Sequence, residues 1–213
     1  MSATLPLRCR VCDAETDGSA APIACPSCGA LLPVHARVSP FALLGVARPR
    51  FALGRDELER AWLTRSRRVH PDRFAAKSEA ERRCAAEQVA ALNDAKRALF
   101  EPYDRALWLV QQASVTPPQL AQQALVELME QRERAEEDAA ARASIVDDAR
   151  ARFRARLEEL GRTLAPLDEA DDGYTAPSPP LRRAAALLAE LKTLARLVDD
   201  LGGGKLIGTL DAR

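Results

Sequence analysis

The sequence predicts an all-α protein with a small cysteine-rich module at its N-terminal end. Alanine, leucine, arginine and glutamate are abundant and aromatic residues make up only 4% of the chain, a composition that favours helices over sheets. Apolar residues recur at three- and four-residue steps from residue 41 to residue 201, which is the spacing of amphipathic helices. Four of the 5 cysteines lie in residues 1–37, which sets that segment apart.

Charge and hydropathy argue against two broad classes of function. Lys and Arg total 31, Asp and Glu total 31, and the formal net charge is +0, which disfavours a general nucleic-acid-binding protein. No apolar run approaches the roughly 20 residues that a membrane span requires. The first ten residues lack the apolar core of a secretory signal. We therefore expect a cytoplasmic protein whose partners are neither nucleic acids nor membranes.

Residues 1–37 are expected to form a module stapled by a metal ion. Cys9, Cys12, Cys25 and Cys28 have the spacing C-x2-C-x12-C-x2-C, and two such pairs complete a tetrahedral structural site. Zinc is the favoured ion and iron in a rubredoxin-like site is its main rival. Disulfides or free thiols are the alternative, which a cytosolic location disfavours. Because the segment is too short to bury a core, we predict that chelation unfolds it while the helices that follow persist.

Two further residues resemble ligands but are assigned other roles. His35 is expected at the surface, because four thiolates already complete the site. Cys84 has no neighbouring cysteine in the sequence and is expected to be a small, buried or half-buried side chain.

Residues 38–115 are expected to form a helical domain interrupted by one tight turn. Helices are predicted for residues 41–46, 56–69, 78–100 and 103–112. Ser78 with Glu81 has the pattern of a capping box, which marks the start of the long third helix.

The most informative motif of the chain, His70-Pro71-Asp72, lies between the second and third of these helices. Proline biases the residue before it away from helical geometry, so His70 and Asp72 are offered from a turn that a partner can reach. Several arginines flank this turn: Arg60, Arg65, Arg67, Arg68 and Arg73. Their local positive charge would steer an acidic protein surface toward the turn. We interpret the motif as a protein contact; the alternative is a solvated helix face beside an ordinary turn.

Residues 116–202 are expected to form a three-helix bundle. Thr116-Pro117-Pro118 breaks the preceding helix and marks a domain boundary. Helices are predicted for 119–138, 143–164 and 181–201, and the last two carry apolar stripes that suit an antiparallel bundle or a coiled-coil hairpin. Residues 168–180 are expected to form a mobile surface loop, and residues 203–213 a flexible tail.

The order of several motifs resembles a known family. These motifs are Phe41-Ala-Leu-Leu-Gly45, His70-Pro-Asp-Arg-Phe74, Leu92-Asn-Asp-Ala95, Pro102-Tyr-Asp-Arg-Ala106 and the segment from Leu125 to Glu133. Over nearly its whole length the chain resembles the J-domain family, and more closely the HscB type of J-protein co-chaperone. The four-cysteine module also resembles that of some members.

The resemblance implies a chaperone partner for the turn. Family members dock this turn and the basic helix on a DnaK/HscA-type chaperone and accelerate its ATP hydrolysis. His70 and Asp72 would then supply polar contacts, and Pro71 would fix the turn. The electrostatic docking residues would be Arg65, Arg67, Arg68 and Arg73.

The resemblance also implies a client for the C-terminal bundle, namely an iron–sulfur scaffold protein of the IscU type. Leu125, Met129, Glu130 and Glu133 fall on one helical face and match positions that the family uses for the scaffold. The alternative is that Leu125 and Met129 belong to the bundle core.

Four residues depart from the family pattern. Arg65 occupies a place where J-domains bury a leucine, and its guanidinium is expected to turn outward. Trp62 replaces tyrosine or phenylalanine, and Lys96 replaces an aromatic residue. Thr193 lies near the place of an aromatic contact to the scaffold.

Two other functions are weighed against this hypothesis. A J-protein with a different client, recruited through the cysteine module, is the first; self-association through the module is also open. A zinc-ribbon nucleic-acid-binding protein is the second, and the absence of aromatic residues among the basic ones argues against it. No intrinsic catalysis is expected, because Gly204-Lys205 lacks the rest of a phosphate-binding loop.

Overall fold

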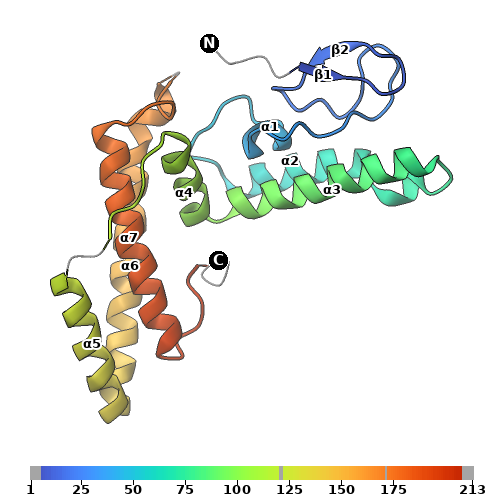
Figure 1. Ribbon diagram of the computed structural model, residues 1–213. Coiled ribbons are helices and arrows are strands. Elements are labelled where there is room, and N and C mark those ends of the chain that lie inside the picture. The colour runs from blue at the N-terminus through green and yellow to red at the C-terminus, as the bar shows by residue number, and fades with distance from the viewer. Residues whose placement is uncertain (1–5, 120–121, 171, 208–213) are drawn as a thin grey trace. The chain divides into compact units, whose positions relative to one another are not determined.

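The computed structural model describes residues 6–119, 122–170 and 172–207, and it confirms the mainly helical prediction (Figure 1). The elements in chain order are strands β1 (Pro6–Arg8) and β2 (Glu15–Asp17), helices α1 (Pro40–Leu44) and α2 (Arg55–Arg68), the 3-10 helix η1 (Pro71–Phe74), and helices α3 (Glu79–Phe100), α4 (Pro102–Gln112), α5 (Gln122–Glu137), α6 (Ala139–Glu169) and α7 (Pro179–Asp200). None of the described helices combines the length and the apolarity that crossing a membrane requires.

The chain divides into two compact units. The first contains the chain up to Pro49 together with Leu53–Phe100, and the second contains Arg50–Ala52 together with the chain from Glu101 onward. The cysteine-rich segment therefore shares a unit with α1, α2 and α3. The domain limits at residues 38 and 116 stay a prediction.

In the first unit, α1 packs on the α2–α3 helix pair (Figure 1). Ser39 begins α1 by accepting a hydrogen bond from the amide of Ala42 at 3.1 Å. The predicted capping box of α3 is present, because the Glu81 amide donates to Ser78 Oγ at 3.3 Å and the Ser78 amide donates to Glu81 Oε2 at 3.2 Å. The fully buried side chains of these helices include Phe41, Leu44, Leu58, Leu92 and Leu99.

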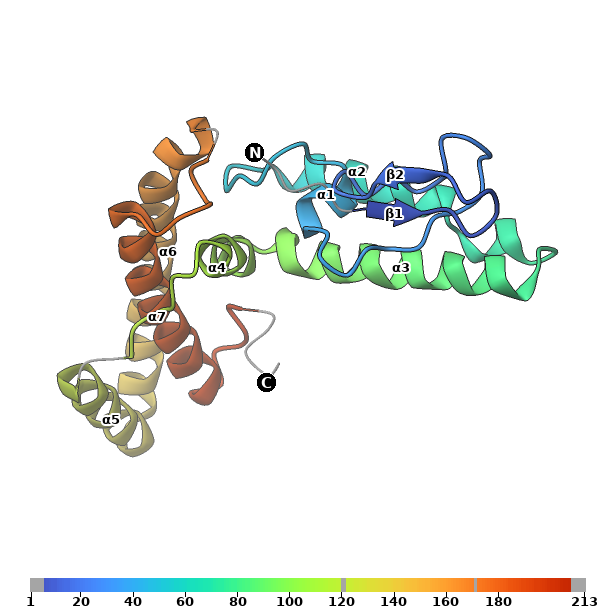
Figure 2. The same cartoon turned by 45° about the horizontal axis from the view of Figure 1, so that its top comes forward.

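The cysteine-rich segment contains the antiparallel strand pair β1–β2 (Figure 2), in which Leu7 lies opposite Thr16. These strands were not predicted, because three residues are too few to show an alternating pattern. Leu7, Cys9, Cys25 and Leu32 form the segment's small buried cluster. Half of that cluster is cysteine, as expected for a module too small for an apolar core.

In the second unit, α6 and α7 pack along each other, α5 packs against α6, and α4 packs against α7 (Figure 2). The α6–α7 interface is built from the predicted apolar stripes. Its buried members include Val146, Phe153, Leu160, Leu164, Leu181, Leu188, Leu191 and Ala195.

Helix α6 is longer than the predicted 143–164. It starts at Ala139, directly after its N-cap Asp138, and it continues through Pro166 to Glu169. Proline in a helix interior removes one hydrogen bond and is unfavourable. The hydrogen bonds that the Asp168 carboxylate accepts from residues outside α6 offset this cost.

The Asp168 carboxylate ties the end of α6 to two other segments. It accepts hydrogen bonds from the amides of Phe51 at 2.6 Å and Ala52 at 2.7 Å. It also accepts one from the Tyr174 hydroxyl at 2.6 Å. Tyr174 is buried, and this burial raises the pKa of its hydroxyl. The expectation of a mobile surface loop over 168–180 is therefore wrong at Tyr174.

Candidate functional site

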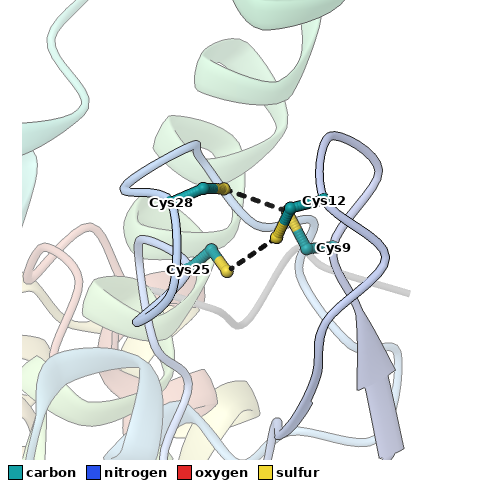
Figure 3. Close-up of side chains that lie close together, drawn as sticks. All are labelled: Cys9, Cys12, Cys25 and Cys28. Carbon is teal, nitrogen blue, oxygen red and sulfur yellow. Dashed lines mark hydrogen bonds between the residues drawn. The ribbon is translucent and has the colours of Figure 1, made fainter.

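The four sulfur atoms of Cys9, Cys12, Cys25 and Cys28 converge on one point (Figure 3). The Cys9–Cys28 and Cys12–Cys25 sulfur pairs are 3.6 and 3.7 Å apart, and all four atoms lie within 4.8 Å of one another. A tetrahedral zinc ion with bonds of about 2.3 Å places its sulfur ligands roughly 3.8 Å apart. All five cysteines lie in described residues, and all are free of disulfide bonds. The arrangement fits a metal ion and disfavours the disulfide alternative.

The two cysteine pairs form equivalent turns. The Asp13 amide donates to the Cys9 carbonyl at 3.0 Å, and the Gly29 amide donates to the Cys25 carbonyl at 2.9 Å. Asp13 has φ 58° and Gly29 has φ 74°, so both occupy the left-handed region that each turn requires. Each of these residues follows the first cysteine of its pair by four positions.

Backbone amides favour the thiolate form of Cys9 and Cys25, whereas for Cys12 the neighbouring thiols and burial outweigh the amide of Ala14 and raise the pKa to about 12. The Val11 amide donates to Cys9 Sγ at 3.4 Å, and this hydrogen bond lowers the pKa of Cys9. The amides of Cys28 and Ser27 lower the pKa of Cys25 to about 6. Thiolates are the form that binds metal, so the backbone prepares these side chains for a cation.

His35 and Cys84 lie outside this cluster. His35 is half-buried, and its Nδ1 accepts a hydrogen bond from the Arg37 amide at 3.1 Å. Cys84 is buried, as predicted, and its thiol donates to the Leu32 carbonyl at 3.4 Å.

The His70-Pro71-Asp72 motif forms the turn between α2 and α3, with Pro71 as the first residue of η1. His70 Nδ1 accepts a hydrogen bond from the Asp72 amide at 3.4 Å, which holds the imidazole against the turn. The His70 and Asp72 side chains are 58% and 89% exposed. The turn therefore offers both groups to solvent, as the sequence predicts.

The arginines predicted for docking do not share one environment. Arg67, Arg68 and Arg73 are exposed, whereas Arg65 is half-buried. Arg65 Nη1 donates to the carbonyl of Ala21 at 2.7 Å. The expectation that this guanidinium turns outward is therefore wrong. Arg65 and Arg67 lie two positions apart on α2, so their side chains point to nearly opposite sides of the helix.

The exposed face of α2 contains an apolar residue that sequence reasoning missed. Leu63 is 37% exposed and lies three and four residues from Arg60 and Arg67, both exposed. Residues at these steps share a helix face. The spacing of Leu63 from these two arginines could have predicted its place on the exposed face.

Two departures from the family pattern compensate each other. The Lys96 ammonium lies 3.7 Å from the centre of the Trp62 ring and 4.7 Å from that of Phe100. An ammonium at this distance from aromatic rings is stabilised by a cation–π interaction. Lysine thus replaces an aromatic contact between α2 and α3 by another attractive contact.

The predicted scaffold-binding residues lie on α5. The Met129 side chain is 61% exposed, and Glu130 and Glu133 are exposed as well. Met129 is therefore a surface residue and not bundle core, while the Leu125 side chain lies outside the described residues. Val126, which is 49% exposed and precedes Met129 by three positions, extends the same face and was missed.

Thr193 lines a small cavity beside this helix. The cavity has a volume of about 90 Å³ and is also lined by Glu127 and Leu128 of α5 and by Leu194 and Leu197 of α7. Leucine and threonine side chains leave room there that a larger side chain would fill.

No protein-family model matches the chain. It is 40% identical over 133 residues to a co-chaperone protein HscB homolog of Bordetella pertussis, covering 56% of this chain and 76% of that protein. It is 34% identical over 167 residues to the homolog of Azoarcus sp., covering 75% of this chain and 91% of that protein.

Two solved structures have the same fold. Human co-chaperone protein HscB matches with a TM-score of 0.75 and 21% identity, over 92% of this chain and 96% of that one. Chaperone HscB from Vibrio cholerae matches with a TM-score of 0.62 and 28% identity, over 78% of this chain and 96% of that one. Taken with the sequence identities to the bacterial homologs, these matches show that the chain belongs to the HscB family of co-chaperones.

Proposed function

We propose that this co-chaperone docks its His-Pro-Asp turn and the exposed face of α2 on a DnaK/HscA-type chaperone and stimulates ATP hydrolysis by that chaperone. The observation that carries the proposal is the exposure of His70 and Asp72, at 58% and 89%, directly after a helix that ends in Arg67 and Arg68. Exposed arginines attract an acidic surface and orient its approach, and the turn then supplies directional hydrogen bonds.

The client in this proposal is an IscU-like scaffold for iron–sulfur cluster assembly, bound by α5. Val126 and Met129 are apolar side chains held at the surface, next to the exposed carboxylates of Glu130 and Glu133. Apolar groups within a polar rim are the usual composition of a protein-binding surface. The acidic rim favours a client surface that carries basic residues.

The four-cysteine site is proposed to hold zinc as a structural ion, with Cys9, Cys12, Cys25 and Cys28 as its ligands. Four thiolates fill the tetrahedral sphere and leave no position for a substrate. The ion would supply folding energy to the surrounding segment, and amides such as that of Val11 would orient the sulfur atoms. Iron is the rival ion, and elemental analysis of the purified protein distinguishes the two.

The mechanism requires no catalytic residue on this chain. Membership in a co-chaperone family agrees with the prediction of an activator of a partner's ATPase rather than an enzyme. A chain that binds the chaperone through α2 and the scaffold through α5 holds both partners in one complex, which raises their effective concentration toward each other. We place this activity in the cytoplasm.

The experiment that tests the chaperone half compares the chain with its His70→Gln variant in a steady-state ATPase assay of a DnaK/HscA-type chaperone. The native chain should accelerate hydrolysis, and the variant should lose this effect while its circular dichroism spectrum stays unchanged. The helical fold should survive because His70 is exposed. Equal stimulation by both proteins would refute the proposal.

A J-protein with another client, recruited through the cysteine module, is the second candidate. Val11 favours it, because this apolar side chain lies between Cys9 and Cys12 and is 71% exposed. Affinity capture from the native cell separates the candidates. Recovery of an IscU-like scaffold supports the first, and its absence beside a different client that is lost in a Val11→Ser variant supports the second.

A further inference from the structure

The cysteine module is joined to the helices of the first unit by polar contacts at Leu32. The Gln88 side chain of α3 donates from Nε2 to the Leu32 carbonyl at 2.7 Å, and the Cys84 thiol donates to the same oxygen at 3.4 Å. Leu32 is 0% exposed and Gln88 is 4% exposed. A buried amide side chain and a buried carbonyl form a hydrogen bond here, and breaking it inside the protein would cost the free energy of leaving a buried donor without its acceptor.

A second contact joins the module to α2 through Arg65. Its Nη1 donates to the Ala21 carbonyl at 2.7 Å, and burial lowers the pKa of the guanidinium. The guanidinium also lies over Gly45, where a Cβ would come within 3.1 Å of Arg65 Nε. Arg65 thus fills the space between the end of α1 and the module. This explains why a donor replaces the leucine that J-domains place there.

The chaperone-docking end of α2 is held by a small number of contacts, and Arg65 makes one of them. Leu58, near the start of the helix, is the buried residue among Arg55–Arg68. Arg67 and Arg68 are exposed, and His70 follows Val69, which is buried. An exposed, arginine-rich last turn contributes little packing of its own, so this end of α2 is held by Arg65, by the buried Val69 and by the hydrogen bond from Arg73 Nη1 to the Arg67 carbonyl at 3.4 Å.

Both carbonyl acceptors belong to the segment that surrounds the second cysteine pair. Ala21 precedes Cys25 by four residues and Leu32 follows Cys28 by four residues. The Leu32 amide donates to the Ile23 carbonyl at 3.0 Å, which closes this segment into a hairpin. Two of the four cysteine ligands, Cys25 and Cys28, lie in this hairpin, so a bound metal ion would help to fix the position of both acceptors.

We infer that Arg65 and Gln88 are positioning residues that couple the metal-held hairpin to the chaperone-docking end of α2, so that metal loading increases the chain's ability to stimulate the chaperone. The statement about stimulation rests on the proposed function. The mechanical coupling is a property of the chain alone and can be tested without any partner.

The test is amide hydrogen exchange of the full chain, loaded with zinc and after treatment with a chelator. Chelation should accelerate exchange in residues 64–69 by about tenfold or more, as expected when a hydrogen bond to a charged group is lost. Faster exchange in residues 9–30 with unchanged exchange in 64–69 would overturn the coupling.

Variants locate the coupling at the named residues. Arg65→Leu in the zinc-loaded state should raise exchange in residues 64–69 and abolish the further effect of chelator. The matched control Arg67→Leu removes the same charge from the exposed face and should leave both exchange patterns native. Should Arg65→Leu fail to fold, Gln88→Leu provides the same test from α3. Native exchange in 64–69 in the folded variant would refute the inference.

An ATPase assay separates this inference from the proposed function. With the chaperone present, Arg65→Leu should stimulate less than the native chain, and chelator should no longer change its stimulation. If the native chain fails to stimulate the chaperone, the proposed function fails, while the exchange result still decides the coupling.

Discussion

The His-Pro-Asp turn and the exposed face of α5, the two surfaces proposed to bind partners, are built in opposite ways. The turn is contiguous in sequence and polar, and His70 is held by a hydrogen bond from the amide of Asp72. The α5 face is assembled from residues one helical turn apart and carries exposed apolar groups at Val126 and Met129. Charge and hydrogen bonds mainly govern approach and specificity, whereas apolar burial supplies affinity. The first surface suits a transient contact, and the second suits the retention of a client.

The two surfaces also depend on different sources of stability. The turn belongs to the unit that contains the cysteine module, in which Cys9 and Cys25 form half of the buried cluster. Helix α5 belongs to the unit whose core is the leucine-rich α6–α7 pair. A perturbation of the metal site should therefore impair the function of the turn and leave the function of the α5 face unchanged.

The largest effect is expected on the α5 face. Replacing Val126 and Met129 together by alanine should weaken binding of an IscU-like scaffold by about 10- to 100-fold, because two apolar contact groups are lost. Isothermal titration calorimetry measures this change. Arg154→Ala is the control, since Arg154 is an exposed arginine of α6 and lies outside α5. Unchanged affinity in the double variant would show that the scaffold binds at another surface of the chain.

Removal of the metal should have an intermediate effect that is confined to one surface. Chelation should unfold the cysteine module, lower stimulation of the chaperone about fivefold, and leave most of the helical circular dichroism signal, since the α6–α7 core contains no cysteine. Scaffold affinity should remain within about twofold of its native value, a change of less than about 0.5 kcal/mol. Collapse of the whole helical signal would contradict this separation.

The smallest effect is expected from a single exposed arginine. Arg67→Ala should reduce chaperone stimulation about threefold at low salt, and the reduction should shrink as salt screens the charge. Titration of the ATPase rate at two ionic strengths measures it. Arg152→Ala is a suitable control, because Arg152 is an exposed arginine of α6. A salt-independent loss would show that Arg67 acts by packing and not by charge.

Sequence patterns predicted the parts of the molecule whose signals are local. The helix cap at Ser78 and Glu81 and the four-cysteine cluster follow from spacing alone, and the structure contains both. The end of α6 was not predictable in this way. Proline signals a helix end, but the contacts of Asp168 with Phe51, which is distant in sequence, extend the helix beyond it.

The arginine-rich helix shows a second limit of sequence reasoning. Arg65 and Arg67 were predicted to share a docking role because both are positively charged and lie near the turn. Their spacing, however, places them on opposite sides of the helix. The partner of Arg65 is a backbone carbonyl at Ala21, and a carbonyl leaves no sequence signature. The contact between Arg65 and the cysteine module therefore could not be predicted from sequence patterns.

The most direct test of the account is a crossed comparison of two variants in two assays. His70→Gln should lose chaperone stimulation and keep native scaffold affinity, whereas the Val126→Ala, Met129→Ala double variant should lose scaffold affinity and keep the stimulation measured without scaffold. This outcome would establish two separable recognition surfaces on one chain. If both variants lost the same activity and kept the other, the assignment of separate partners to the turn and to α5 would be wrong.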